Sequence, residues 1–268
     1  MVGFLIVFGL MAVSLGFILG YPYWLGWKRN RIRSKPFPER WLATVQSILP
    51  MYEKLTVEQQ QHLRGSMQVL LAEKQFIGCN GLTVTEEMKV VIVAIASLLL
   101  FRDHQNYFPK LRSILIYPTA FRVKQVVDVG GGVIQERQEV RLGESWARDQ
   151  LVLSWQQVQY DSQHWADGHN VVLHEFAHQL DQADGKAEGL PILRKQEDYV
   201  TWAQVMTREY QQLCQDAKRG QKTVLNTYGA LNPAEFFAVA TETFFEKPHQ
   251  MLKKHPQLYQ QLATYYNL

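Results

Sequence analysis

The first 27 residues of the chain carry no charged side chain, and this feature constrains the fold more than any other in the sequence. The run from Val2 to Trp27 is rich in Phe, Leu, Ile and Val. It is long enough to cross a hydrocarbon core, which takes roughly 20 residues of helix. Aromatic residues gather at its end, as at a membrane–water interface. These are Tyr21, Tyr23, Trp24 and Trp27. We therefore expect residues 1–27 to form a single transmembrane anchor.

A basic cluster follows the uncharged run and predicts its orientation. It consists of Lys28, Arg29, Arg31, Arg33 and Lys35. A cleaved signal peptide would place its positive charge before the apolar stretch, so the order here favours an anchor. By the positive-inside rule we expect a bacterial inner-membrane protein with residues 28–268 in the cytoplasm. The alternatives are a cytoplasmic protein without an anchor and a periplasmic hydrolase of cell-wall peptides, which needs the opposite topology.

The remainder of the chain has no excess of positive charge. Five of the 28 basic residues lie in the cluster, which leaves 23 basic and 25 acidic residues after position 35. We therefore expect no direct nucleic-acid binding. The two cysteines, Cys79 and Cys214, form no CxxC pair, so a thiolate metal site or a disulfide framework is not indicated.

The pattern of residues predicts one domain at 39–268, joined to the anchor by a basic, proline-containing linker at 28–38. Thr56-Val57-Glu58-Gln59 is typical of a capping box that opens a helix. Gly130-Gly131-Gly132 lacks the Lys-Ser/Thr of a phosphate loop and predicts a hairpin turn. Helices are expected at 39–49, 56–75, from 83 onward, at 169–183, at 197–218 and as one last long helix from 232, with strands at 114–117, 125–129, 139–142 and 151–155. We therefore predict an α+β fold, mainly helical with a small mixed sheet.

His174-Glu175-Phe176-Ala177-His178 matches the pattern H-E-x-x-H. Residues four apart lie on one face of a helix, so both imidazoles can bind one Zn²⁺. Glu175 can reach a metal-bound water and act as general base, because zinc lowers the pKa of that water to about 7. Apolar residues at 171, 172, 176 and 180 give this helix a surface to bury. We therefore expect a packed helix whose two histidines hold a metal ion.

A catalytic zinc site needs a third protein ligand. The residue six positions after His178 is Asp184, which excludes the third histidine of a metzincin. Glu235 lies in an apolar segment that would bury its carboxylate, so it is the main candidate. Asn232-Pro233-Ala234-Glu235 also fits an N-cap, a Pro at N1 and a Glu at N3 of a capping box. The residues alone leave ligand and cap open. Glu242, two turns later, is a reserve ligand or a partner for a ligand imidazole.

The segment from His174 to Gly185, taken with Tyr228 and with Asn232 to Val239, resembles the MtfA family of bacterial zinc peptidases. The resemblance covers roughly residues 40–268. It implies a gluzincin-like domain, akin to the catalytic domain of anthrax lethal factor. The implied zinc ligands are His174, His178 and Glu235, and the implied base is Glu175. The resemblance also implies that Tyr228 hydrogen-bonds the oxyanion of the tetrahedral intermediate.

The resemblance further implies an aminopeptidase-like zinc metallopeptidase that holds one Zn²⁺ and cleaves peptide or protein substrates. A member of the family binds a transcriptional repressor, which adds a repressor to the expected partners. The alternative function is a membrane-tethered regulator that sequesters a DNA-binding repressor, with peptidase activity secondary. We also expect the strand at 151–155 to pair with an extended substrate at a sheet edge.

Overall fold

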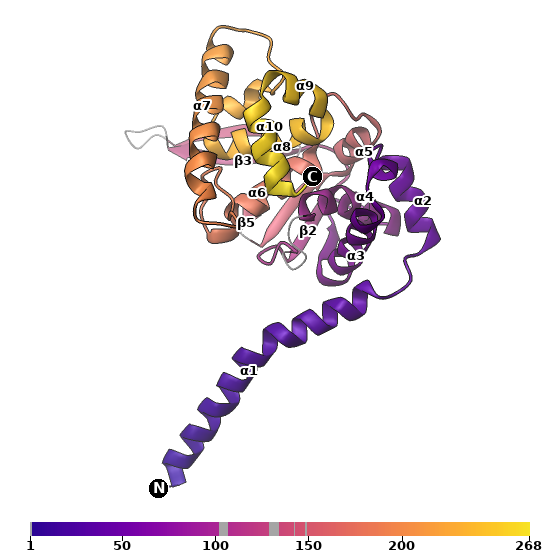
Figure 1. Ribbon diagram of the computed structural model, residues 1–268, viewed down its shortest axis with the longest axis vertical. Helices are drawn as coiled ribbons and strands as arrows, with labels where there is room; N and C mark the ends of the chain where they lie inside the picture. Colours follow the sequence, from indigo (N-terminus) through magenta and orange to yellow (C-terminus); the bar gives the residue numbers. More distant parts are fainter. Residues whose placement is uncertain (1, 102–106, 129–133, 142, 148) are drawn as a thin grey trace.

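The computed structural model describes residues 2–101, 107–128, 134–141, 143–147 and 149–268. The predicted turn at Gly130-Gly131-Gly132 lies outside the described residues. Most of the described chain is helical, and its described strands lie between residues 75 and 154 (Figure 1).

The N-terminal helix α1 (Val2–Arg33) extends away from the rest of the molecule and joins it only with its last turns (Figure 1). There Arg29 forms two hydrogen bonds of 2.8 Å with the carboxylate of Glu73. The guanidinium of Arg29 also lies 4.7 Å from the centre of the Tyr107 ring. The end of α1 is thus fastened to the domain by a bidentate ion pair and an aromatic contact.

No helix in the described part of the chain is long and apolar enough to cross a membrane. The predicted fold class is therefore wrong in its first element, and so is the expected membrane anchor at residues 2–27. The uncharged run does not form a helix of its own. From Tyr21 onward the same helix includes Pro22 and Gly26 and then four basic residues.

The helices that follow are those that local signals indicate: α2 (Glu39–Ile48), α3 (Val57–Glu73) and α4 (Glu86–Ser97). The capping box at α3 is confirmed, because the Gln59 backbone N–H donates to Thr56 Oγ1 at 3.2 Å and the Thr56 backbone N–H donates to Gln59 Oε1 at 2.9 Å. From Val90 onward α4 is buried throughout, as expected for a core helix without charges.

The main sheet has the strand order β1-β2-β6-β5. Strands β1 (Gln75–Gly78), β2 (Ser113–Tyr117) and β6 (Gln150–Ser154) are parallel, and β5 (Gly143–Ala147) pairs with β6 in the antiparallel sense. A separate hairpin consists of β3 (Phe121–Asp128) and β4 (Ile134–Arg141). Since β6 has β2 on one side and β5 on the other, it has no free edge. The expectation that strand 151–155 pairs with a substrate is therefore wrong.

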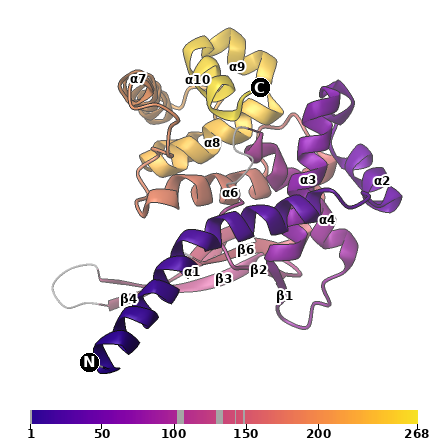
Figure 2. The same cartoon turned by 60° about the horizontal axis from the view of Figure 1, so that its bottom comes forward.

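From Trp155 onward the chain is helical and covers the sheet (Figure 2). Its helices are α5 (Trp155–Gln163), α6 (Val171–Asp181), α7 (Asp198–Lys218), α8 (Pro233–Glu246), α9 (Pro248–Lys254) and α10 (Pro256–Tyr266), with a short 3₁₀ turn η4 (Thr227–Ala230) before α8. The predicted single last helix is thus three helices. Pro248 and Pro256 each begin a new one, because the first turn of a helix accepts proline without the loss of a backbone hydrogen bond. Helix α6 lies over the sheet and α8 packs on α6 (Figure 2).

Candidate metal centre

Helix α6 carries the H-E-x-x-H residues and begins at a well-satisfied N-terminus. The side chain of Asn170 accepts a hydrogen bond from the backbone N–H of Leu173 at 3.2 Å. The buried carboxylate of Asp161 accepts the backbone N–H of Val171 at 2.7 Å. The apolar face of the helix, including Phe176, is buried. These contacts fix the helix and therefore the direction in which His174 and His178 project.

Helix α8 brings Glu235 to the same place. Asn232 caps this helix by accepting the Glu235 backbone N–H at 2.9 Å, and Pro233 occupies its first turn. The carboxylate of Glu235 does not complete a capping box, because it faces the histidines. Its Oε2 lies 2.9 Å from His174 Nε2. The backbone of Glu235 therefore takes part in the cap while its side chain reaches α6.

The three candidate ligand atoms form a compact triangle. His174 Nε2 lies 3.2 Å from His178 Nε2, and His178 Nε2 lies 3.5 Å from Glu235 Oε2. Two ligands on a tetrahedral Zn²⁺ with bonds of about 2.0–2.1 Å are separated by about 3.3 Å. The sides of the triangle match this value, and within the described residues this is the one cluster of three such side chains that could hold a metal ion. The two-nitrogen, one-oxygen set also fits the donors that zinc prefers.

Glu242 contacts His174 at Nδ1, the ring nitrogen that does not face Glu235. It is 1% exposed, and its Oε2 accepts a hydrogen bond from His174 Nδ1 at 3.0 Å. Its Oε1 lies 2.8 Å from His169 Nδ1 and 2.8 Å from the Asn170 backbone nitrogen. With Nδ1 of His174 engaged by Glu242, Nε2 is the ring nitrogen that is directed toward Glu235. Of the two roles that the sequence left open for Glu242, the structure shows the contact with the imidazole of His174, a candidate metal ligand.

The ionisation of these groups reflects their burial and their contacts. Burial disfavours the charged form of Glu235, but hydrogen bonds from His174 and His178 outweigh it and hold the pKa of Glu235 well below its ordinary value. Burial likewise opposes ionisation of Glu242, and His174 and His169 outweigh it and lower the pKa to about 2. Both carboxylates are therefore anions at neutral pH, as metal binding and ligand support require.

Glu175 and Tyr228 flank the triangle. Glu175 is 5% exposed, and its burial raises the pKa of its carboxyl group against the opposing effect of His174 and His178. A buried carboxylate with a raised pKa is suited to take up a proton. The ring of Tyr228 lies on η4, half exposed, with its centroid 6.0 Å from that of His174. The structure thus brings all five predicted site residues together.

Two acidic residues near the site have roles that the sequence did not reveal. The carboxylate of Asp181 accepts the backbone N–H groups of Gly189 at 3.0 Å and Leu190 at 2.7 Å. Glu246 accepts the backbone N–H groups of Ala166 at 3.1 Å and Gly168 at 3.0 Å, in the loop that leads into α6. The sequence signal that could have indicated Glu246 is its spacing from Glu235 and Glu242 along one helix.

Comparison with known proteins places the chain in a family. The model of the family described as glucose-regulated metallo-peptidase M90 matches residues 24–267. The chain belongs to this family.

Two relatives of this M90 chain extend over most of its length. An uncharacterized protein of Synechocystis, slr2042, is 44% identical over 264 residues, which cover 98% of this chain and 96% of the relative. Mlc titration factor A of Yersinia pestis is 29% identical over 246 residues, which cover 91% and 88%. The predicted membership of the MtfA family is confirmed, and with it a metallopeptidase-type protein.

Proposed function

We propose that this M90 chain is a zinc metallopeptidase whose metal is held by His174, His178 and Glu235. The observation that carries the proposal is the triangle of ligand atoms, with sides of 2.9, 3.2 and 3.5 Å. A catalytic zinc ion takes three protein ligands and keeps a further position for water or substrate. In this proposal, three side chains from helices α6 and α8 supply the protein ligands.

In the proposed mechanism, Glu175, Tyr228 and Glu242 each have a separate role in peptide hydrolysis. When bound, the metal supplies a Lewis acid that activates water and polarises the scissile carbonyl. Glu175 accepts the proton of the attacking water and delivers it to the leaving amine. The phenol of Tyr228 donates a hydrogen bond to the oxygen that becomes negative. Glu242 keeps His174 in the tautomer that binds metal through Nε2.

The test separates metal binding from catalysis. Glu175→Gln is expected to keep a full equivalent of zinc, measured by elemental analysis, and to lose about 10²- to 10⁴-fold in kcat on short chromogenic peptides. Glu235→Gln is expected to lose the metal as well as the activity. Comparing substrates with free and blocked amino termini tests an aminopeptidase-like preference. Undiminished turnover by Glu175→Gln, or full zinc occupancy in Glu235→Gln, would refute the assignment.

A second candidate function is the capture of a transcriptional repressor. It is favoured by the printed name of the Yersinia relatives, Mlc titration factor A, which are 29% identical over 91% of the chain. In this proposal the chain binds a DNA-binding repressor and removes it from its operator. The peptidase-inactive Glu175→Gln variant discriminates, because a sequestering protein needs no turnover. Release of an Mlc-type repressor from labelled operator DNA by this variant would support sequestration, and no release at micromolar concentrations would contradict it.

A further inference from the structure

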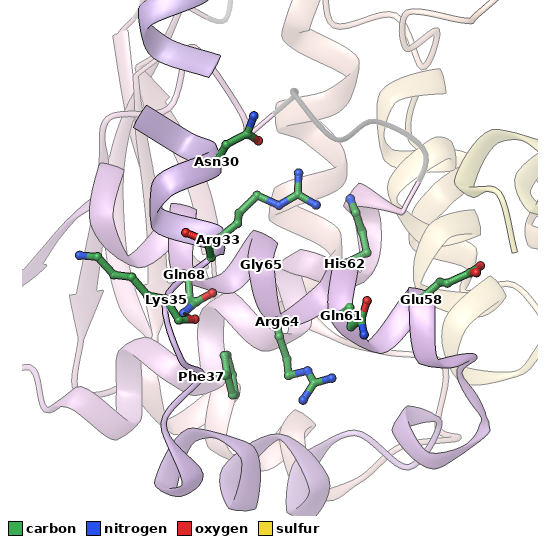
Figure 3. A pocket seen from close by; sticks show the side chains of 11 residues that line it. Asn30, Arg33, Lys35, Phe37, Glu58, Gln61, His62, Arg64, Gly65 and Gln68 are labelled. Carbon is green, nitrogen blue, oxygen red and sulfur yellow. Dashed lines mark hydrogen bonds between the residues drawn. The ribbon is translucent and has the colours of Figure 1, made fainter. Parts of the chain in front are cut away.

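A pocket lies between the last turns of α1, the connection at residues 34–38 and helix α3, and none of the proposed site residues lines it (Figure 3). Among its lining residues, Arg33, Lys35 and Arg64 point their charged groups in different directions (Figure 3). These groups do not converge on a common point, so the pocket indicates no ligand. The feature that bears on the metal centre lies elsewhere, in the turn η4 that carries Tyr228.

The turn η4 brings Tyr228 to the metal centre without a long helix or a strand to hold it. It consists of four residues, and 3₁₀ segments have poor hydrogen-bond geometry. The Tyr228 side chain is half exposed, with its ring centroid 6.0 Å from that of His174. A donor stabilises a developing oxyanion from a distance of about 2.7–3.1 Å. The proposed role of Tyr228 therefore requires that contacts outside the turn fix its backbone.

One such contact is the close approach of Gly229 to two helices. Gly229 is buried, and a Cβ atom added there would lie 3.2 Å from Cδ2 of Leu213 on α7. It would also lie 3.2 Å from Cβ of Val239 and 3.3 Å from Cα of Phe236, both on α8. These two atoms belong to the helix backbone or adjoin it, so they cannot rotate away. A larger residue would therefore separate η4 from α8, the helix that carries Glu235, by a few tenths of an ångström.

Helix α7 holds the end of the turn. Tyr210 Oη and Cys214 Sγ lie 3.4 Å and 3.6 Å from the carbonyl oxygen of Ala230, to which both can donate. Because residues 210 and 214 are four apart, they lie on one face of α7. The ring of Tyr210 also packs edge-on against that of Phe236, with centroids 5.7 Å apart. Tyr210 therefore contacts η4 and α8 at the same time.

The start of η4 is fixed by Asn226. Its side-chain oxygen accepts the backbone N–H of Tyr228 at 2.9 Å, and its carbonyl oxygen accepts the backbone N–H of Gly229 at 3.1 Å. Residues 226–228 are exposed, whereas α8 is buried from Phe236 to its end. When the space at Gly229 is overfilled, we therefore expect η4 to move and α8 to stay in place with Glu235.

We propose that Gly229 and Tyr210 are positioning residues for the reaction at the metal centre, which hold η4 so that the Tyr228 phenol faces the substrate oxygen. The inference rests on the proposed function, in which Tyr228 stabilises the oxyanion. Neither residue belongs to the candidate ligand set. The phenol acts on charge that develops in the transition state. Disturbing the turn therefore lowers kcat and leaves KM and zinc binding unchanged.

Steady-state kinetics of the full chain with zinc and short chromogenic peptides test the proposal. Gly229→Ala is expected to lower kcat about three- to tenfold, since a misplacement of about 1 Å costs about 10²-fold. Its KM and its zinc dissociation constant are expected to equal those of the wild type. Tyr210→Phe keeps the ring on Phe236 and removes the hydroxyl group, which is expected to lower kcat about two- to tenfold, the worth of one hydrogen bond. Gly26→Ala is the matched control with wild-type kcat, because a Cβ at Gly26 would meet no atom of the described residues within 4 Å.

A double-mutant cycle separates positioning from a general loss of structure. Tyr228→Phe alone is expected to lower kcat about 10²- to 10³-fold, as for the loss of an oxyanion donor. In that background Gly229→Ala and Tyr210→Phe are expected to change kcat by less than about 1.5-fold, because the phenol that they hold is already gone. A second readout needs no metal. The nuclear Overhauser effect between the ring protons of Tyr228 and His174 in the metal-free chain is expected to be weaker in Gly229→Ala than in the wild type.

Circular dichroism verifies the folding of each variant, and Tyr210→Phe decides if Gly229→Ala fails to fold. Three results would overturn this proposal and leave the proposed function intact: wild-type kcat in a folded Gly229→Ala variant, an equal loss of kcat in both backgrounds, or an undiminished Overhauser effect. Absence of zinc-dependent turnover, or wild-type kcat in Tyr228→Phe, would instead refute the proposed role of Tyr228 and this inference with it.

Discussion

Replacing Glu242 by glutamine removes one charge while conserving the shape of the side chain. Three contacts of Glu242 are affected: those with His169 Nδ1 at 2.8 Å, with the Asn170 backbone nitrogen at 2.8 Å and with His174 Nδ1 at 3.0 Å. The glutamine oxygen can accept from His169 and from Asn170, as Oε1 does in the wild type. The amide nitrogen then faces His174 Nδ1, which leaves two donors opposed.

His174 can relieve this conflict only by moving its proton from Nδ1 to Nε2. That tautomer places a hydrogen where the metal would bind. Either outcome costs one charge-assisted hydrogen bond, about 1.5–3 kcal/mol. At about 1.4 kcal/mol per factor of ten, this corresponds to a loss of about 10- to 150-fold in zinc affinity. The range agrees with the 10- to 100-fold that supporting carboxylates typically contribute to metal sites.

Competition with a chromogenic chelator measures the change in zinc dissociation constant directly. Peptidase activity of Glu242→Gln is expected to recover in part when zinc is added in excess, because the proposed base, Glu175, is intact. Glu197→Gln is the control, since its side chain is 75% exposed and its contact is with Lys195 at the surface. A zinc affinity for Glu242→Gln within about twofold of the wild type would refute the inferred orientation of His174.

Three further predictions follow from contacts around the site. Gly189→Ala is expected to lower the free energy of unfolding in urea by about 1–3 kcal/mol, because φ is +70° and a Cβ would lie 2.2 Å from the Pro233 carbonyl oxygen; unchanged stability would contradict this packing. Burial raises the pKa of Glu246 to about 8 against its backbone hydrogen bonds. The folded state therefore binds its proton more tightly than the unfolded state, so unfolding free energy should fall as pH rises from about 4.5 to about 8. That slope should flatten in Glu246→Gln, and an unchanged slope would disprove the assignment. Removing the metal with EDTA is expected to lower the melting temperature of the wild type, since zinc binds the folded state, but not that of Glu235→Gln; an equal decrease in both would contradict the proposed ligand.

The parts of the fold that the sequence predicted are those encoded by neighbouring residues. The box at Thr56 and the cap at Asn232 each need only a few consecutive side chains, and both are present. The spacing of His174 and His178 likewise sets both rings on one helix face without reference to the rest of the fold. Local signals of this kind are readable from one sequence.

The features that were not predicted depend on distant partners. Strand β1 is only four residues long and exists because Gln75 to Gly78 pair with β2, almost 40 residues further along the chain. Asp181 and Glu246 accept hydrogen bonds from backbone N–H groups. Every residue except proline carries such a group, so the residue types of the partners do not indicate these contacts. The uncharged run of α1 carried a composition typical of a membrane span, but its continuation as one helix through a basic segment was not evident. Pairing, backbone recognition and helix length are decided by the assembled fold.

The two oxygens of Glu242 join an outer imidazole to an inner one. His169 is 40% exposed at its side chain, and Glu242 links it to His174 in the interior. The same carboxylate contacts both rings. We therefore expect a change in the electron distribution of His174 to alter the chemical shifts of His169. The proton and nitrogen resonances of His169 would thus report metal binding at the proposed site. This ring is accessible to solvent and is not one of the proposed ligands.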